Sequence, residues 1–150
     1  MPPEPDFDDL DALFLEVEIQ EDARSVWSAL VDDEQRREWW PDLALRAELG
    51  GALLEDWRDD EGNQQRTRGQ VLDLEPERRL RCSWQDDGWP AATEVDILLD
   101  GGVDSTRVAL RHSGWQALPA AQHLRDAHRT GWSMHLANLK SFVESGGSWF

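Results

Sequence analysis

The sequence predicts an α+β fold in which a strongly bent antiparallel sheet wraps around one long C-terminal helix. Between residues 43 and 112, hydrophobic and polar residues alternate, and turns rich in glycine and aspartate divide the region into short strands. From residue 119 to 146, hydrophobic residues instead recur every three or four positions, as on one face of an amphipathic helix. The predicted order is one strand, two short helices, six strands and the long helix, and the alternation argues against a parallel sheet.

The composition is that of one globular domain with an acidic surface. The 150 residues carry a formal net charge of −16, which argues against nucleic acid and anionic membranes as partners, because both repel an acidic surface. The acidic excess fits either a salt-rich cytoplasm or an ordinary solvated surface. We expect a mobile, proline-rich leader over residues 1–12, the domain over residues 13–146 and a short tail over residues 147–150.

The expected location is the cytoplasm. The N-terminus has neither the basic nor the apolar region of a signal peptide, and no stretch approaches the roughly 20 apolar residues that span a bilayer. Cys82 is the only cysteine, which excludes an internal disulfide and a cysteine-based zinc site. Its alternation with Leu80 and Trp84 indicates a core position.

The N-terminal third should supply a strand and two helices. Residues 13–20 alternate as a half-buried strand does. Asp22 is a typical N-cap residue and predicts a helix over residues 23–31. A second short helix over residues 34–40 should end at Pro41.

Six further strands follow, and turn residues close most of them. In the sixth and seventh strands of the chain, Glu94 and Asp96 face Arg107 and Arg111, so these charges should mark the solvent side of the sheet. Apolar residues and a histidine occupy the opposite face. The predicted strands span residues 43–49, 52–58, 65–74, 79–85, 93–99 and 105–112.

The C-terminal helix carries an apolar stripe that contains two histidines, while Arg125 and Arg129 fall mostly off it. Pro119 suits the helix start, and the pair Gly146-Gly147 suits its C-terminal cap. Because a bent sheet and a helix curve apart at one end, we expect a ligand cavity between them. The stripe comprises Leu124, His128, Gly131, Trp132, His135, Leu136, Leu139, Phe142 and Val143.

A series of short motifs carries a family resemblance over residues 13–146. In order they are Val26-Trp27-Ser28-Ala29-Leu30, Trp39-Trp40-Pro41, Gly50-Gly51, Gly69-Gln70-Val71-Leu72-Asp73-Leu74-Glu75-Pro76, Leu80-Arg81-Cys82-Ser83-Trp84, Ser105-Thr106-Arg107-Val108, His112-Ser113-Gly114-Trp115 and Gly131-Trp132. The chain thereby resembles the START-like or Bet v 1-like (SRPBCC) helix-grip superfamily, and within it the domain homologous to the activator of the heat-shock 90 ATPase. The resemblance implies a helix-grip fold with a hydrophobic cavity, and a fold alone does not assign a reaction.

Three histidines are candidates for metal or acid–base chemistry. His128 and His135 share a helix face, but seven residues separate their backbones by about 10 Å, too far for one zinc ion. His112 ends a strand and could approach the same cavity, although a histidine on an apolar face is more often a hydrogen-bonded core residue. We therefore expect no metal and no cofactor, and we assign no catalytic residue. His123 lies off the stripe and should be solvated.

Glu55 shares one face of its strand with Leu53 and Trp57, and the resemblance implies that this is the inner face. A carboxylate there would be a polar anchor, or a general base with a raised pKa. Alternatively, the strand is twisted or shifted by one residue, and Glu55 lies in water.

The nine tryptophans and the absence of tyrosine are unusual for a chain of this length. Trp27 and Trp84 fit core positions, whereas Trp40, Trp57, Trp115 and Trp132 could equally line a cavity. The predicted ligand-binding residues are Trp40, Glu55, Trp57, Ile97, Val108, Leu110, His112, Trp115, His128, Trp132 and His135.

Function must be inferred from the cavity, because the sequence has no nucleophile elbow, phosphate-binding glycine loop or zinc-protease motif. The leading hypothesis is a non-enzymatic protein that binds a hydrophobic or amphipathic small molecule. The first alternative, implied by the resemblance, is a co-chaperone-like protein with a chaperone partner. The second is an enzyme of the polyketide cyclase or hydrolase kind, which would use Glu55 with one of the inward histidines.

Overall fold

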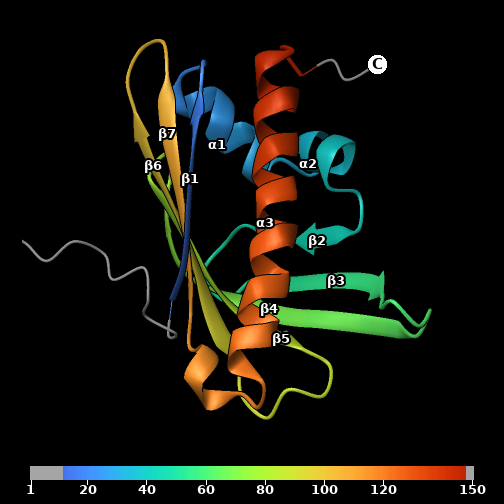
Figure 1. The fold of residues 1–150 in the computed structure, drawn as a ribbon. Coiled ribbons are helices and arrows are strands. Elements are labelled where there is room, and N and C mark those ends of the chain that lie inside the picture. The colour runs from blue at the N-terminus through green and yellow to red at the C-terminus, as the bar shows by residue number, and fades with distance from the viewer. Residues whose placement is uncertain (1–11, 148–150) are drawn as a thin grey trace, which may run out of the picture.

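The protein folds as a seven-stranded antiparallel sheet packed on one long helix, in a computed structural model that describes residues 12–147. The elements, in chain order, are β1 Ala12–Ile19, α1 Ala23–Val31, α2 Asp33–Trp39, β2 Leu43–Leu45, β3 Ala52–Arg58, β4 Gln64–Glu75, β5 Arg79–Asp86, β6 Thr93–Gly101, β7 Thr106–Ser113, the 3-10 helix η1 Trp115–Ala117 and α3 Ala121–Glu144. Helix α3 lies across one face of the sheet, with α1 and α2 beside its C-terminal half (Figure 1). The predicted α+β helix-grip fold is confirmed.

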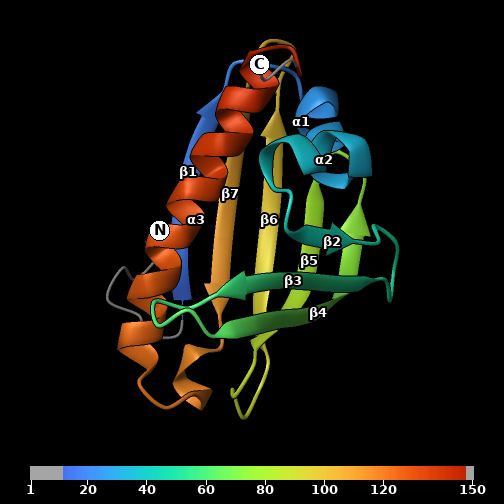
Figure 2. The same ribbon diagram turned by 90° about the vertical axis from the view of Figure 1, so that its right-hand side faces the viewer.

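The sheet bends because its two halves run in different directions. The strand order is β1-β7-β6-β5-β4-β3-β2, and each neighbouring pair is antiparallel. Figure 2 shows β2, β3 and β4 running nearly crosswise to β6 and β7. A register shift between Val71 and Asp73 interrupts the pairing of β4 with β5, and such a bulge increases local bending.

The predicted helix caps are present. The Asp22 side chain accepts a hydrogen bond from the Ser25 backbone N–H at 2.8 Å, which satisfies one of the free donors at the start of α1. At the other end of the chain, Gly146 and Gly147 have φ values of +77° and +80°, and the Gly147 N–H donates to the Phe142 carbonyl. Glycine adopts this left-handed backbone without strain, so the pair ends α3 as expected.

A few boundaries differ from the sequence prediction. Strand β2 stops at Leu45 instead of residue 49, because the backbone of residues 46–51 forms local turns, including a bond from Glu48 N–H to the Arg46 carbonyl. The 3-10 helix η1 was not predicted. Residues 1–11 of the predicted leader lie outside the described residues, as do residues 148–150, whereas Ala12 begins β1.

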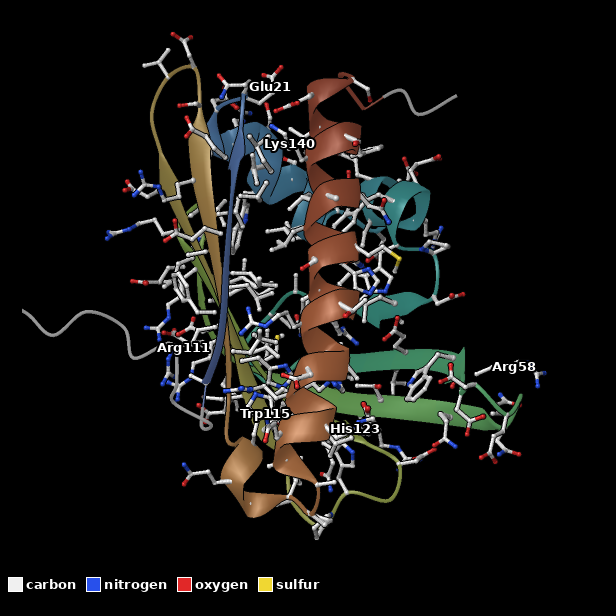
Figure 3. The ribbon with its side chains drawn as sticks, in the orientation of Figure 1. Glu21, Arg58, Arg111, Trp115, His123 and Lys140 are labelled. Carbon is white, nitrogen blue, oxygen red and sulfur yellow. The ribbon has the colours of Figure 1, made fainter. Side chains whose placement is uncertain are left out.

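The apolar stripe of α3 packs on the sheet, with Leu136, Leu139, Phe142 and Val143 buried. Arg125 is also buried, contrary to the expectation from the helical period. On the opposite face of the sheet, Arg79 of β5 forms a two-pronged ion pair with Asp96 of β6. Figure 3 shows Arg111 on this same face, pointing away from α3, as the alternation predicts.

Two further points concern polar burial and membranes. The guanidinium of Arg36 is 3% exposed and donates to the carbonyls of Leu30 and Leu45, which ties α2 to α1 and β2. Within residues 12–147, no helix combines the length and the apolar character that crossing a membrane requires.

Candidate ligand-binding cleft

Two hollows lie between α3 and the sheet, and they differ in size and polarity. The first is a nearly closed apolar cavity of about 30 Å³, bordered by α2, β5 and β6, which has room for little more than one water molecule. The second is an open cleft of about 320 Å³ between β3, β4 and β5 and the N-terminal half of α3. The cleft is lined by Glu55, Trp57, Thr67, Trp84, Asp86, Ala127, His128, Gly131, Trp132 and His135.

Two other hollows are broader and lie over the outer surface. One, of about 460 Å³, lies between α1 and the C-terminal end of α3, and the other, of about 550 Å³, lies between α2 and β2. Charged and small polar side chains make up much of both linings, and neither contains an aromatic cluster. The 320 Å³ cleft therefore fits the usual features of a small-molecule site best.

His112 anchors the closed core behind the cleft. Its side chain is 0% exposed, its Nδ1 accepts a hydrogen bond from Trp132 Nε1 at 3.0 Å, and its Nε2 lies 2.6 Å from Thr93 Oγ1. The Thr93 hydroxyl donates onward to the Trp84 carbonyl, so Nε2 must carry the imidazole proton. Burial, with a smaller contribution from His128, holds the pKa of His112 well below its usual value. His112 is thus a neutral residue whose hydrogen bonds are all satisfied.

His128 and Asp86 form a pair at the cleft wall. His128 Nδ1–H donates to the Leu124 carbonyl at 2.9 Å, so in the neutral ring Nε2 presents a lone pair. Asp86 Oδ2 lies 3.6 Å from Nε2, and a proton is needed between them for a hydrogen bond. Burial raises the pKa of Asp86 and lowers the pKa of His128. The pair can therefore take up and release a proton.

Two residues hold the Asp86 carboxylate in place. Thr67 donates its hydroxyl proton to Asp86 Oδ1 at 2.6 Å, and Trp57 Nε1–H donates to the Thr67 oxygen at 3.0 Å. The sequence prediction missed Asp86 and Thr67. The predicted strand ended at residue 85, one residue before Asp86. Leu80, Cys82, Trp84 and Asp86 nevertheless continue one alternation, and the structure buries all four. That alternation was the signal for an inward carboxylate.

Glu55 lies in the cleft and points inward from β3. Its Oε2 accepts a hydrogen bond from Trp40 Nε1 at 2.7 Å, and the side chain is only partly exposed. Burial raises the pKa of Glu55, and the nearby carboxylates of Asp42 and Asp86 raise it further. Of the two alternatives drawn from the sequence, the structure has the inward one.

His135 completes the aromatic wall. Its ring stacks on Trp40 with a centroid distance of 3.7 Å, and burial lowers its pKa to about 4. Its buried Nδ1 has no hydrogen-bond partner among the described residues. The ring of Trp132, one turn away, lies edge-on to the ring of Trp40, and its centroid is 5.1 Å from that of Trp84.

The structure divides the predicted ligand-binding residues among three environments. Glu55, Trp57, His128, Trp132 and His135 meet in the open cleft. Trp40 and Ile97 border the small closed cavity, to which Trp132 also contributes. The remaining residues are fully buried and border neither hollow, and Figure 3 shows one of them, Trp115, between the sheet and the N-terminal half of α3. These are Val108, Leu110, His112 and Trp115.

The described residues include no group of three or more histidine, cysteine, aspartate or glutamate side chains that could hold a metal ion. Burial raises the pKa of the Cys82 thiol to about 12, so this thiol is unsuited to act as a nucleophile.

The arrangement of the sheet and helices is that of the SRPBCC, or Bet v 1-like, superfamily. DynU16, a protein of the dynemicin biosynthetic locus, has 22% sequence identity and a TM-score of 0.75, with 95% of this chain and 49% of that chain covered. This chain thus spans about half the length of DynU16. Protein NE0264 from Nitrosomonas europaea has 19% identity and a TM-score of 0.73, over 95% and 99% of the two chains.

CalU16 from Micromonospora echinospora is 27% identical, with a TM-score of 0.67 over 88% of this chain and 75% of that chain. No curated protein matches the chain. The family model described as activator of Hsp90 ATPase homolog 1-like protein matches residues 22–144, and the chain belongs to this family.

Proposed function

We propose that the protein binds an amphipathic small molecule in the cleft between α3 and strands β3, β4 and β5. The observation that carries the proposal is the lining itself, in which three indoles form apolar walls and a few polar groups converge. The likeness in fold to DynU16, a protein of the dynemicin biosynthetic locus, is compatible with a small-molecule role. The apolar cavity of about 30 Å³ is too small to be the site without rearrangement.

Gly131 supports the same location. It lies in the middle of α3, where glycine costs roughly 0.5–1 kcal/mol of stability relative to alanine. A Cβ atom added to Gly131 would meet nothing within 4 Å, so close packing does not require the glycine. The lack of a side chain at Gly131 instead leaves space in the cleft beside α3.

Blocking the cleft at Gly131 tests the proposal. Gly131→Phe should reduce binding of the neutral fluorescent probe N-phenylnaphthylamine by at least about tenfold, because the new ring occupies the site. Ala137→Phe introduces the same ring at an exposed position of α3 and should leave the affinity unchanged. Equal probe affinity in the two variants, with both folded by circular dichroism, would contradict the proposal.

The Asp86–His128 pair favours one alternative, an acid–base enzyme of the polyketide cyclase kind. A carboxylate and an imidazole that lie 3.6 Å apart at the wall of a cleft are suited to move a proton to or from a bound molecule. Glu55, in contrast, hydrogen bonds to Trp40 and not to a histidine. Turnover that is lost in Asp86→Asn and His128→Gln but kept in Glu55→Gln would support this alternative.

A further inference from the structure

We propose that the ligand of the cleft is an organic cation, an amine or quaternary ammonium group attached to an apolar or aromatic body. This inference rests on the proposed function, and it names the class of ligand. It follows from the charges of the lining, from the free oxygens of two carboxylates and from the indole walls.

The lining is negative, and no described lining residue carries a fixed positive charge. Glu55 from β3 and Asp86 from β5 are the carboxylates, and His128 and His135 from α3 are the other titratable groups. Burial lowers the pKa of both histidines, so they are neutral near pH 7. Asp42 lies close enough to raise the pKa of Glu55 further, which adds to the negative potential. A cation is the charge that this environment attracts.

Each carboxylate keeps one oxygen without a donor among the described residues. Trp40 donates to Glu55 Oε2, which leaves Oε1 free. Thr67 donates to Asp86 Oδ1, while Oδ2 faces the lone pair of His128 Nε2. A partly buried carboxylate without its full set of donors is costly. A protonated amine would supply N–H donors and positive charge, and a quaternary ammonium group would supply the positive charge alone.

The apolar walls suit the body of such a molecule. Trp57, Trp84 and Trp132 contribute indoles, the aromatic group that attracts cations most strongly, by roughly 0.5–2 kcal/mol per contact. An anionic ligand such as a fatty acid would meet two carboxylates and no compensating arginine or lysine in this lining. A neutral ligand would fill the cleft but leave both carboxylates uncompensated. The overall charge of −16 would also speed the encounter with a cation.

A matched series of three probes distinguishes a cationic from a neutral or an anionic ligand. Naphthylmethylamine, naphthylmethanol and naphthoate share one ring system and differ in charge, and their affinities can be measured by calorimetry at pH 7.5. We expect the amine to bind at least about tenfold more tightly than the alcohol, and the carboxylate to bind most weakly. An alcohol that binds as well as the amine would overturn the cation inference and leave small-molecule binding intact. Failure of all three probes to bind would contradict both.

Charge-neutralising variants test whether the preference for the amine arises from the carboxylates of the cleft. The double change Glu55→Gln and Asp86→Asn keeps the side-chain shapes and should reduce the preference for the amine over the alcohol to under about threefold. Asp56→Asn is the matched control, because Asp56 is exposed on the other face of β3 and paired with Arg66. A preference unchanged in the double variant, or lost equally in the control, would overturn the assignment to the cleft.

Discussion

The two halves of α3 face the same sheet but differ in what surrounds them. In the C-terminal half, Leu136, Leu139 and Phe142 are buried in the apolar core, and the hollow beside them, toward α1, has no aromatic cluster. From the N-terminal half to just past the middle of the helix, His128, Gly131 and His135 border an open cleft with two carboxylates on its far side. This difference shows that a single amphipathic helix can pack in the core at one end and border a candidate ligand-binding cleft at the other. The sharp bend of the sheet at β4 separates the two ends (Figure 2).

Trp132 joins the two halves, and its truncation should have the largest effect. The indole is 4% exposed and donates to His112 Nδ1, so Trp132→Ala removes a large buried ring and leaves a buried acceptor unpaired. We expect a loss of about 3–5 kcal/mol in the free energy of unfolding, measured with urea. Trp57→Ala, on the more open side of the cleft, should cost clearly less. Equal losses in the two variants would contradict the proposed division of α3.

Acid should destabilise the protein through its buried histidines. His112, His128 and His135 have lowered pKa values in the folded chain, so the unfolded chain binds protons first as the pH falls through about 6.5. Their contribution is therefore fully present above that pH and is lost below it, by roughly 1–2 kcal/mol in total between pH 7 and 6. The raised pKa values of Glu55 and Asp86 act in the opposite direction at lower pH, because the folded carboxylates take up protons first.

Urea unfolding at the two pH values measures this effect. His123→Gln, at an exposed position near the start of α3 (Figure 3), is the control and should show the same fall as the unmodified protein. A stability that stays constant or rises between pH 7 and 6 would mean that the pKa values of the three histidines are not lowered in the folded state.

Gly131→Ala should produce a smaller change of the opposite sign. The added methyl group meets open space, and alanine favours the helix by about 0.5–1 kcal/mol, so the urea midpoint should rise. The same methyl group narrows the cleft and should weaken binding of N-phenylnaphthylamine. A fall in stability would show that the helix is packed at this turn.

The smallest expected change concerns the Asp86–His128 pair. The Asp86 carboxylate partly offsets the desolvation that lowers the pKa of His128. Asp86→Asn removes this charge, and the pKa of His128, followed by NMR, should decrease further. An unchanged pKa would mean that the two side chains do not interact in solution.

The fold could be predicted because its signals are local. Strand alternation, the Asp22 cap and the Gly146-Gly147 cap each depend on a few neighbouring residues, and they place most elements within one or two residues of the observed bounds. The periods of β3 and α3 likewise brought Glu55, Trp57, His128, Trp132 and His135 to the inner side of the molecule.

The open part of the interior could not be predicted in the same way. Val108 and Leu110 have the same inward period as Trp57, but they are fully buried and border neither the cleft nor the small cavity. Only the bend between β4 and β5 decides which inward residues reach solvent, and it depends on the packing of distant segments. Asp86 was missed because its position beside Asp87 and Gly88 is also typical of a turn.

The central claim, that the N-terminal half of α3 forms the ligand site, is tested most directly by the indole N–H signals in an NMR titration with naphthylmethylamine. The signals can be assigned with single Trp→Phe variants. We predict shifts of the indole signals of Trp57 and Trp132, which border the cleft. The signals of Trp27 in α1 and Trp39 in α2 should stay unchanged. Shifts confined to Trp39 and Trp40, around the closed cavity, or no shift at saturating probe, would contradict the claim.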